Sequence, residues 1–376
     1  MQKKKILHII QSLGNGGCEN MLLRTLPLLT RDFEHHIITL RELGELGEKF
    51  KGKNISIETV DWYGFFHISG YRRLLKKTKQ FSPDIIITYL FHADMIGRIF
   101  LQRKVPASII PFLRTTYNHP KYLVARILEW ITKPLVKKYL ANSEAVKDFY
   151  IKHIGVQPKK ITVIPNGLDI EYFDSILPDP ELKKSLGISP DDFTIICVAN
   201  FHVNKGHRYL LEAFETVSLR RSESTATIQH HSLKLLLVGN GEERKNLEQQ
   251  IETYRSKNNI LFLGRRTDVP QLLKISNCFI LPTLFEGMSN ALMEAMAAGL
   301  PIITTDIPEN RQLIKDGESG ILVSLMNTSN LVQTMEKLIN NARQREVLGK
   351  NAKNRIFKQL NMNIVISKFE RLLHSL

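Results

Sequence analysis

The sequence predicts an α/β protein with two doubly wound domains, each built on a parallel sheet. Its 376 residues exceed what one hydrophobic core usually supports, so two domains of roughly 150 to 200 residues are expected. Short apolar runs rich in Ile and Val alternate with amphipathic segments, a pattern typical of parallel strands covered by helices on both faces. A polar, proline-containing passage at 174–192 interrupts the alternation and marks the boundary.

We therefore expect a first Rossmann-like domain over 1–175 and a second over 190–360. The last helix, 361–376, is expected to pack back on the first domain. Such sheets bind ligands at the carboxyl ends of their strands. The two domains are therefore predicted to face each other across a cleft that holds the chemistry.

The first domain is expected to contain six buried strands, separated by amphipathic helices. The strands are predicted at 5–10, 35–40, 83–90, 107–113, 137–143 and 159–167. The helices are predicted near 18–29, 70–80 and 120–137.

The second domain repeats the pattern after the boundary passage. Its strands are predicted at 193–200, 233–239, 259–264, 278–282, 301–306 and 320–324. A helix should begin near His207, and another should run from about Asn290 to Ala298, where Gly299 follows as a stop signal. The polar, patternless segment 219–232 is interpreted as a surface excursion.

The net charge of +15 and the pI near 9.6 raise the hypothesis that the protein binds nucleic acid. Residues 1–180 hold 27 of the 52 Lys and Arg but only 17 of the 37 Asp and Glu, so most of the excess lies in the first domain. Its densest patches, 71–80 and 131–140, interleave bases with apolar residues. They are either solvated helix faces or surfaces for anionic lipid headgroups. No zinc-finger spacing, basic zipper or aromatic platform supports nucleic-acid binding.

The cysteines and the N-terminal segment indicate a cytoplasmic protein. Cys18, Cys197 and Cys278 form no CxxC pair, which argues against a disulfide framework and a zinc site. The apolar run after the first lysines is interrupted by His8 and Gln11, so it is interpreted as a strand rather than a signal peptide. No run approaches the roughly 18 apolar residues of a membrane span.

The segment 6–23 reads as a strand, a glycine loop and a helix, which points backbone amides at an anion. Gly16 and Gly17 lie in this loop. Glu19 stands where the dinucleotide fingerprint requires glycine, so a Rossmann dehydrogenase is disfavoured. A simple tight turn remains the alternative. The GxG at 239–241 is followed by acids and is weak evidence by itself.

Lys205 and Gly206 fall between a buried strand and the helix that begins near His207. A lysine there can place a positive charge beside a phosphate while the helix end supplies amides. A lone surface lysine is the alternative interpretation.

Two glutamates frame the helix predicted after the strand 278–282. Glu286 precedes the helix, and Glu294 lies inside it among Ala, Met and Leu. A carboxylate on a mostly apolar helix is costly unless it accepts hydrogen bonds, and sugar hydroxyls would supply them. The residues whose backbone or side chains could cradle a diphosphate between the glutamates are Gly287, Met288, Ser289 and Asn290.

These residues resemble family 4 of the retaining glycosyltransferases, also described as glycosyl transferases group 1, which have the GT-B fold. The Glu-x7-Glu motif stands as Glu286 and Glu294 in "LFEGMSNALMEAMAAGLP", and "KKITVIPNGLD", "LLLVGNGEERKNLE" and "DGESGILV" also match. The resemblance covers almost the whole chain. It implies that Glu294 binds the nucleotide ribose, Glu286 the donor sugar as a catalytic residue, and Lys205 the diphosphate.

The resemblance implies further contacts for the donor. Gly16 and Gly17 would approach it from the first domain, and the backbone near Arg265 would form part of the nucleobase pocket. His92 follows a strand, where relatives place a catalytic histidine facing the donor sugar; a structural histidine is the alternative. Arg114, at another strand end, is an acceptor-side candidate.

One position departs from the family. Members commonly carry an arginine shortly before the Lys-Gly pair, where Asn200 or His202 stands here. The diphosphate then loses a contact, or a protonated His202 or Arg265 compensates.

The expected reaction transfers a sugar, with retention, from a nucleoside diphosphate to an acceptor hydroxyl. No DxD motif occurs, so no metal and no other cofactor is expected. The resemblance favours UDP as the nucleotide and a front-face mechanism without a protein nucleophile.

The basic first domain favours a lipid-linked glycan as acceptor, in polysaccharide, lipopolysaccharide O-antigen or protein-glycan assembly, with peripheral contact at the inner face of an anionic membrane. A nucleotide-sugar epimerase of the GT-B fold and a non-catalytic partner subunit remain alternatives.

Overall fold

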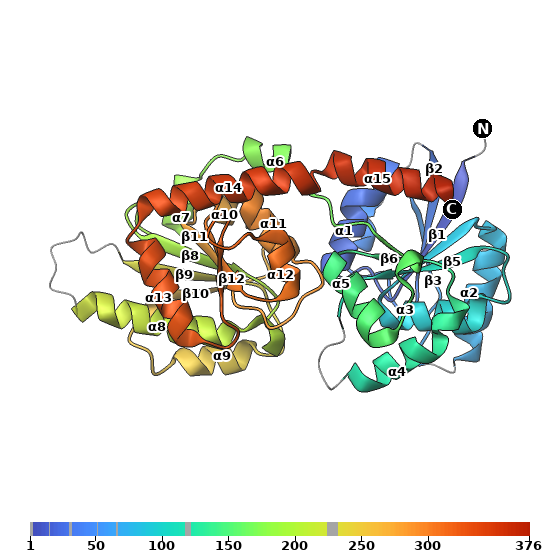
Figure 1. Ribbon diagram of the computed structural model, residues 1–376, viewed down its shortest axis with the longest axis horizontal. Helices are drawn as coiled ribbons and strands as arrows, with labels where there is room; N and C mark the ends of the chain where they lie inside the picture. Colours follow the sequence, from blue (N-terminus) through green and yellow to red (C-terminus); the bar gives the residue numbers. More distant parts are fainter. Residues whose placement is uncertain are drawn as a thin grey trace. The chain divides into compact units, whose positions relative to one another are not determined.

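The computed structural model describes residues 3–14, 16–29, 32–50, 52–64, 67–116, 122–223 and 232–376. The chain forms two compact units (Figure 1). The first consists of Met1–Gly167 with Met362–Leu376, and the second of Leu168–Asn361. Each unit is a parallel sheet with helices packed against its faces.

The sheet of the first unit has seven strands in the order β3-β2-β1-β4-β5-β6-β7, all parallel. Their bounds are β1 Lys4–Ile10, β2 Phe33–Thr39, β3 Ser56–Thr59, β4 Ile85–Tyr89, β5 Ser108–Leu113, β6 Tyr139–Ala141 and β7 Ile161–Val163. The strand β3 was not predicted. It lies at the sheet edge, and its side chains Ser56, Ile57, Glu58 and Thr59 are at most partly buried, so it lacks the apolar run that identifies the other strands.

Helices pack against both faces of this sheet. They are α1 Gly17–Thr25, α2 Ile68–Phe81, α3 Leu90–Ile96, α4 Leu123–Thr132, α5 Glu144–Phe149 and α15 Met362–Ser375. In β1, Ile6 packs in one core cluster and Leu7 in another, because successive side chains of a strand point to opposite faces. The predicted helix 120–137 corresponds to α4 and a following 3-10 turn, Lys133–Leu135; its first two residues lie outside the described ranges.

The sheet of the second unit has six strands in the order β10-β9-β8-β11-β12-β13, also all parallel. Their bounds are β8 Phe193–Val198, β9 Leu233–Val238, β10 Ile260–Gly264, β11 Cys278–Leu281, β12 Ile302–Thr305 and β13 Ile321–Val323. The chain order reverses between β8 and β11. This is the topological switch point, where doubly wound sheets bind ligands.

The helices of the second unit are α6 Ile170–Ser175, α7 Pro180–Ser185, α8 His207–Glu223, α9 Arg244–Ile251, α10 Val269–Lys274, α11 Asn290–Ala297, α12 Pro308–Leu313, α13 Thr328–Ile339 and α14 Ala342–Leu360. Residues 219–223, predicted as part of a surface excursion, instead continue α8. The last turn is held by a tertiary contact, since Arg220 pairs with Glu336 of α13 at 3.2 Å. Residues 224–231 lie outside the described ranges.

The chain changes units at Gly167 rather than in the polar passage 174–192. Leu168, Ile170 and Phe173 pack in the core of the second unit. At the other end, α15 lies along the first unit (Figure 1) and contributes Val365 and Phe369 to its core. Within the described residues, no helix combines the length and apolarity needed to cross a membrane.

Candidate functional site

The loops that follow β8 and β11 pack closely at the switch point of the second unit. Gly206 has φ +70°, and a Cβ atom there would lie 2.0 Å from the carbonyl oxygen of Pro282, so only glycine fits without strain. The carbonyl oxygen of Asn204 accepts hydrogen bonds from Leu284 N at 2.7 Å and Thr283 Oγ1 at 3.0 Å. These contacts bring Lys205 beside Glu286.

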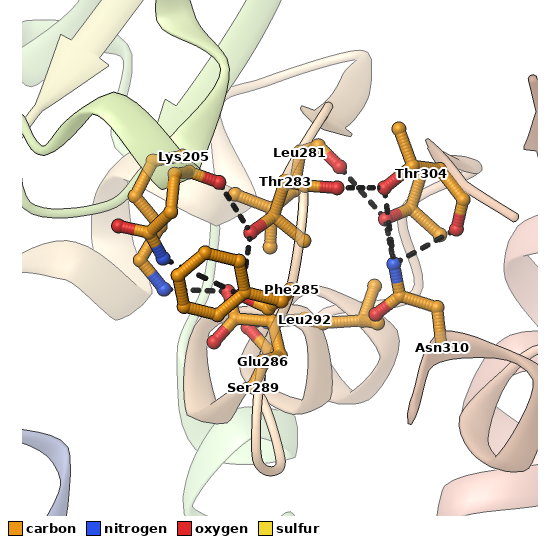
Figure 2. Close-up of polar contacts among 11 residues, drawn as sticks. Lys205, Leu281, Thr283, Phe285, Glu286, Ser289, Leu292, Thr304 and Asn310 are labelled. Carbon is orange, nitrogen blue, oxygen red and sulfur yellow. Dashed lines mark hydrogen bonds and ion pairs between the residues drawn. The ribbon is translucent and has the colours of Figure 1, made fainter. Parts of the chain in front are cut away.

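Lys205 and Glu286 form an ion pair. The Nζ atom of Lys205 donates to Oε1 of Glu286 at 2.5 Å, and their side chains are 20% and 10% exposed (Figure 2). Two candidates from the sequence analysis that are separated by 81 positions in the chain are therefore in direct contact. A phosphate group entering here would compete with the carboxylate for the ammonium, leaving Glu286 as a hydrogen-bond acceptor.

The helix α11 begins directly after this pair. Ser289 is its N-cap, with Oγ accepting from Leu292 N at 3.3 Å. The loop residues Gly287 and Met288 are buried and partly buried, and Asn290 is the first helical residue. The positive end of the helix dipole therefore lies beside Glu286, an arrangement that favours anions.

Glu294 lies in the middle of α11 and is only 8% exposed. Its neighbours on the helix, including Met293 and Ala295, are buried in the apolar core. A buried carboxylate at this position can accept hydrogen bonds from ligand hydroxyls at low desolvation cost, because its own hydration has already been lost.

A buried polar network fixes the ends of β11 and β12. Asn310 Nδ2 donates to Thr304 Oγ1 at 2.8 Å and to the carbonyl oxygen of Thr305 at 2.9 Å (Figure 2). Thr304 Oγ1 donates to Leu281 O at 2.7 Å, and Thr305 Oγ1 donates to Thr283 O. The sequence analysis did not single out these residues, although the threonines at the end of β12 and just after β11 were a visible signal.

The remaining candidates of this unit lie in the loops that follow β8, β9 and β10. His202, which stands where an arginine is common, is exposed with Nδ1 3.3 Å from Oε1 of Glu242. Arg265 is exposed and follows β10. Gly241 is required by packing rather than by an anion, since a Cβ atom there would lie 2.4 Å from Phe201 O.

His207 is a buried histidine at the first residue of α8. Burial, with a smaller effect from Lys205, lowers its pKa to about 3. Neither ring nitrogen has a hydrogen-bond partner among the described residues, and the ring packs edge-on against Phe201 with centroids 4.8 Å apart. The histidine is therefore neutral at pH 7 and leaves Lys205 as the cation next to Glu286.

In the first unit, the glycine loop and His92 follow adjacent strands, β1 and β4. Gly16 is the N-cap of α1 and Gly17 its first residue. His92 lies exposed on α3, two residues after Leu90, which has φ +67°. Partial burial and, to a lesser extent, Arg41 lower the pKa of His92, so Arg41 is a neighbour that the sequence analysis missed.

Two contacts within the first unit fix the side chain of Arg114. Its Nη1 donates to Asn166 Oδ1 at 2.7 Å, and its guanidinium lies 4.5 Å from the centroid of the Phe112 ring. Asn166 follows β7 and was not predicted as its partner.

Among the described residues, no group of three or more His, Cys, Asp and Glu side chains is arranged to hold a metal ion.

Two relatives of this chain are named as glycosyltransferases. The chain is 28% identical over 310 residues to UDP-Gal:alpha-D-GlcNAc-diphosphoundecaprenol alpha-1,3-galactosyltransferase of Escherichia coli, covering 80% of this chain and 76% of that one. It is 24% identical over 369 residues to the N-acetylgalactosamine-N,N'-diacetylbacillosaminyl-diphospho-undecaprenol 4-alpha-N-acetylgalactosaminyltransferase of Campylobacter jejuni, covering 94% and 95%.

The fold is also that of a solved structure. Anabaena Alr3699/HepE in complex with UDP-glucose matches with a TM-score of 0.84 and 20% identity, over 99% of this chain and 100% of that one. This likeness shows the GT-B fold. Two family models divide the sequence between them: Glycosyltransferase Family 4 matches residues 15–172, and Glycosyl transferases group 1 matches residues 178–355. Since the two matches cover most of the chain, this protein belongs to the family 4 glycosyltransferases.

Proposed function

We propose that this glycosyltransferase moves a sugar, with retention and without a metal ion, from a UDP-sugar to a hydroxyl group of a lipid-linked glycan. The observation that carries the proposal is the Lys205–Glu286 pair at the switch point, 2.5 Å apart, directly before α11 with its buried Glu294. One nucleotide sugar offers a partner to each of these groups.

Binding of the donor would separate the ion pair of Lys205 and Glu286, because each side chain would contact a different part of the donor. Its diphosphate takes the ammonium of Lys205 and the N-terminal amides of α11, which stabilise the negative charge that develops on the leaving group. The released Glu286 then accepts hydrogen bonds from sugar hydroxyls, and Glu294 accepts them from the ribose. Because Lys205 and the helix dipole supply positive charge, turnover is expected without a divalent cation. The roles of Gly16, Gly17, His92, Arg114 and Arg265 stay predictions.

The acceptor is proposed from the relatives and from charge. Both relatives described above are named for transfer to diphosphoundecaprenol-linked sugars. The first unit holds 29 Lys and Arg against 14 Asp and Glu, so it carries the whole net charge of +15. This suits a cytoplasmic enzyme working peripherally on an anionic membrane surface. Polysaccharide or protein-glycan assembly is the expected setting.

The test is a panel of UDP-, GDP- and ADP-sugars incubated with the protein in EDTA, with and without a lipid-linked acceptor. We expect nucleoside diphosphate to be released from one UDP-sugar and Glu294→Ala to lose at least about 100-fold of the rate, the order lost when one preorganised polar contact is removed. Glu346→Ala, an exposed carboxylate on α14, is the matched control and should retain activity.

The same assay separates the alternatives. An altered sugar remaining on UDP would identify an epimerase instead. Activity that is absent in EDTA and restored by Mg²⁺ would contradict metal independence. The anomeric configuration of the product, read by NMR, decides between retention and inversion.

A further inference from the structure

The helix α4 of the first unit turns its apolar side outward. Five large apolar residues on it are 48–68% exposed: Leu123, Val124, Ile127, Trp130 and Ile131. We call this set the α4 face. The buried residues of the same helix are polar, Glu129 and Thr132. An ordinary surface helix has the opposite arrangement, so this helix needs a specific explanation.

A buried ion pair holds α4 in this orientation. Glu129 Oε2 lies 2.5 Å from Arg98 Nη1, and both side chains are fully buried. Tyr150 donates its hydroxyl to Glu129 Oε1 at 3.1 Å, and Arg98 also donates to Thr132 Oγ1 at 3.1 Å. Rotating the apolar face inward would take Glu129 away from the buried Arg98, whose other acid, Asp94, lies 3.9 Å away. Breaking a buried ion pair has a high cost. The outward face is therefore fixed by the fold.

The spacing of the α4 face makes one continuous stripe. Positions 123, 124, 127, 130 and 131 follow the i, i+1, i+4, i+7, i+8 pattern that places residues on one side of a helix. In Figure 1, α4 runs along the lower edge of its unit. Contiguous exposed apolar surface of this kind marks an interaction site on a globular protein.

Basic residues border the α4 face. Lys133 Nζ lies 5.4 Å from the centroid of the Trp130 ring, and Lys152 is exposed on η6 Tyr150–Ile154, which packs against α4. Arg126, on α4 itself, and Lys152 both act to lower the pKa of His153, after partial burial, so these bases lie close together. The only acid on α4, Glu129, faces inward. The border is complementary to negative charge.

We propose that the α4 face inserts into the headgroup region of an anionic lipid bilayer. An amphipathic helix with a Lys and Arg border and Trp and Leu on its apolar side lies in the membrane interface, and tryptophan prefers that depth. The inference rests on the proposed function, because it names the surface that would hold the enzyme where a lipid-linked acceptor resides. The Arg98–Glu129 pair also joins α4 to η3 Gly97–Leu101, the continuation of the helix that carries His92.

The first experiment uses the two tryptophans of the chain. Trp130 is 59% exposed and Trp62 only 4%, so a change at the membrane reports on α4. Vesicles of phosphatidylcholine with phosphatidylglycerol should shift the emission to the blue, and lipids brominated in the acyl chain should quench it. Phosphatidylcholine alone should give little effect. Trp130→Phe should abolish the shift; persistence of the shift in this variant would overturn the proposal.

The second experiment measures vesicle binding by flotation, without nucleotide sugar. We expect Val124→Ser/Ile131→Ser to weaken binding to the anionic vesicles at least 10-fold. The matched control, Val347→Ser/Phe357→Ser, removes two exposed apolar side chains of α14 and should bind as the unsubstituted protein does. Equal binding by both double variants would contradict the proposal.

Two further outcomes are decisive. If the protein is a dimer in solution and Val124→Ser/Ile131→Ser makes it monomeric, the face is covered by a second copy and the lipid proposal is wrong. Release of nucleoside diphosphate from a soluble donor does not require the membrane, so failure to bind vesicles with donor turnover intact rejects this inference alone. Vesicle binding without any donor turnover rejects the proposed function alone.

Discussion

Lys205 and Glu286 illustrate how much one residue pair contributes to this site. Their charged atoms lie 2.5 Å apart with side chains mostly shielded from water, so each neutralises the other while no ligand is bound. Removing one partner leaves an uncompensated charge, which is costly in a shielded position. The pair therefore has both a structural effect and a proposed catalytic effect, and the two can be measured separately.

Lys205→Met should lower donor turnover about 100- to 1000-fold, because one preorganised positive group is removed from the leaving diphosphate. Initial rates with the active donor measure the loss. The control is Lys315→Met, whose ammonium pairs with Glu318 at the surface and should leave the rate unchanged. The double variant Lys205→Met/Glu286→Gln removes the stranded carboxylate; recovery of full turnover in it would contradict a direct role for Lys205.

Because burial lowers the pKa of His207, the stability of the second unit should depend on pH. Its pKa falls from 6.5 to about 3 on folding, so below pH 6.5 the unfolded chain binds a proton that the folded chain rejects. The contribution is complete above pH 6.5 and is lost as the pH falls from 6.5 toward 3. Between pH 7 and pH 5 the loss is about 2 kcal/mol.

Urea unfolding followed by circular dichroism at the two pH values measures this contribution. In His207→Leu the difference in unfolding free energy between pH 7 and pH 5 should shrink by about 2 kcal/mol. The control His202→Gln removes an exposed imidazole and should leave the difference unchanged. An unaltered pH dependence in His207→Leu would show that its burial is not coupled to folding.

At the scale of elements, the close contact between the loops after β8 and β11 depends on Gly206. An alanine Cβ there would meet the carbonyl oxygen of Pro282, at 2.0 Å, whereas one at Gly187 has no atom within 4 Å; the φ angles, +70° and +67°, match. Gly187→Ala therefore costs only backbone strain, about 1 kcal/mol.

Gly206→Ala should cost at least about 2 kcal/mol more than Gly187→Ala, because the loops must also separate. It should in addition reduce donor turnover, since Lys205 moves relative to Glu286, whereas Gly187→Ala should retain it. Chemical denaturation and initial rates test the two effects. Equal costs for the two variants would mean that the loops separate freely.

The elements differ in how well the sequence predicted them. Strands such as β1 and β4 were predicted because they are buried on both faces and read as continuous apolar runs. The edge strand β3 was missed for the opposite reason. The helix α4 was predicted, but its orientation was not, because apolar periodicity ordinarily indicates the inward side and here Glu129 takes that side through Arg98.

At the scale of the whole molecule, the C-terminal helix belongs to the unit formed by the N-terminal part of the chain. Phe369 of α15 is 2% exposed and packs edge-on against Phe112 of β5, with ring centroids 6.2 Å apart. Both tryptophans, Trp62 and Trp130, also lie in this unit. Tryptophan fluorescence therefore follows the unfolding of the first unit.

Phe369→Ala should destabilise the first unit by about 3 to 5 kcal/mol, the usual cost of emptying an aromatic core site. The transition followed by tryptophan fluorescence should move to lower urea. The control Phe357→Ala, which truncates an exposed side chain of α14, should leave that transition in place. No change with Phe369→Ala would contradict a structural role for α15 in this unit.

The sequence by itself determined the two α/β domains and the positions of most strands along the chain, because burial leaves a local pattern in the residues. It also singled out Lys205, Glu286 and Glu294 as candidates, whose roles stay predictions. Tertiary structure alone decided the change of units at Gly167, the pairing of His202 with Glu242, the Asn310 network and the outward face of α4. Each of these depends on which distant groups meet, and a contact between residues far apart in the chain leaves no periodic pattern in either segment.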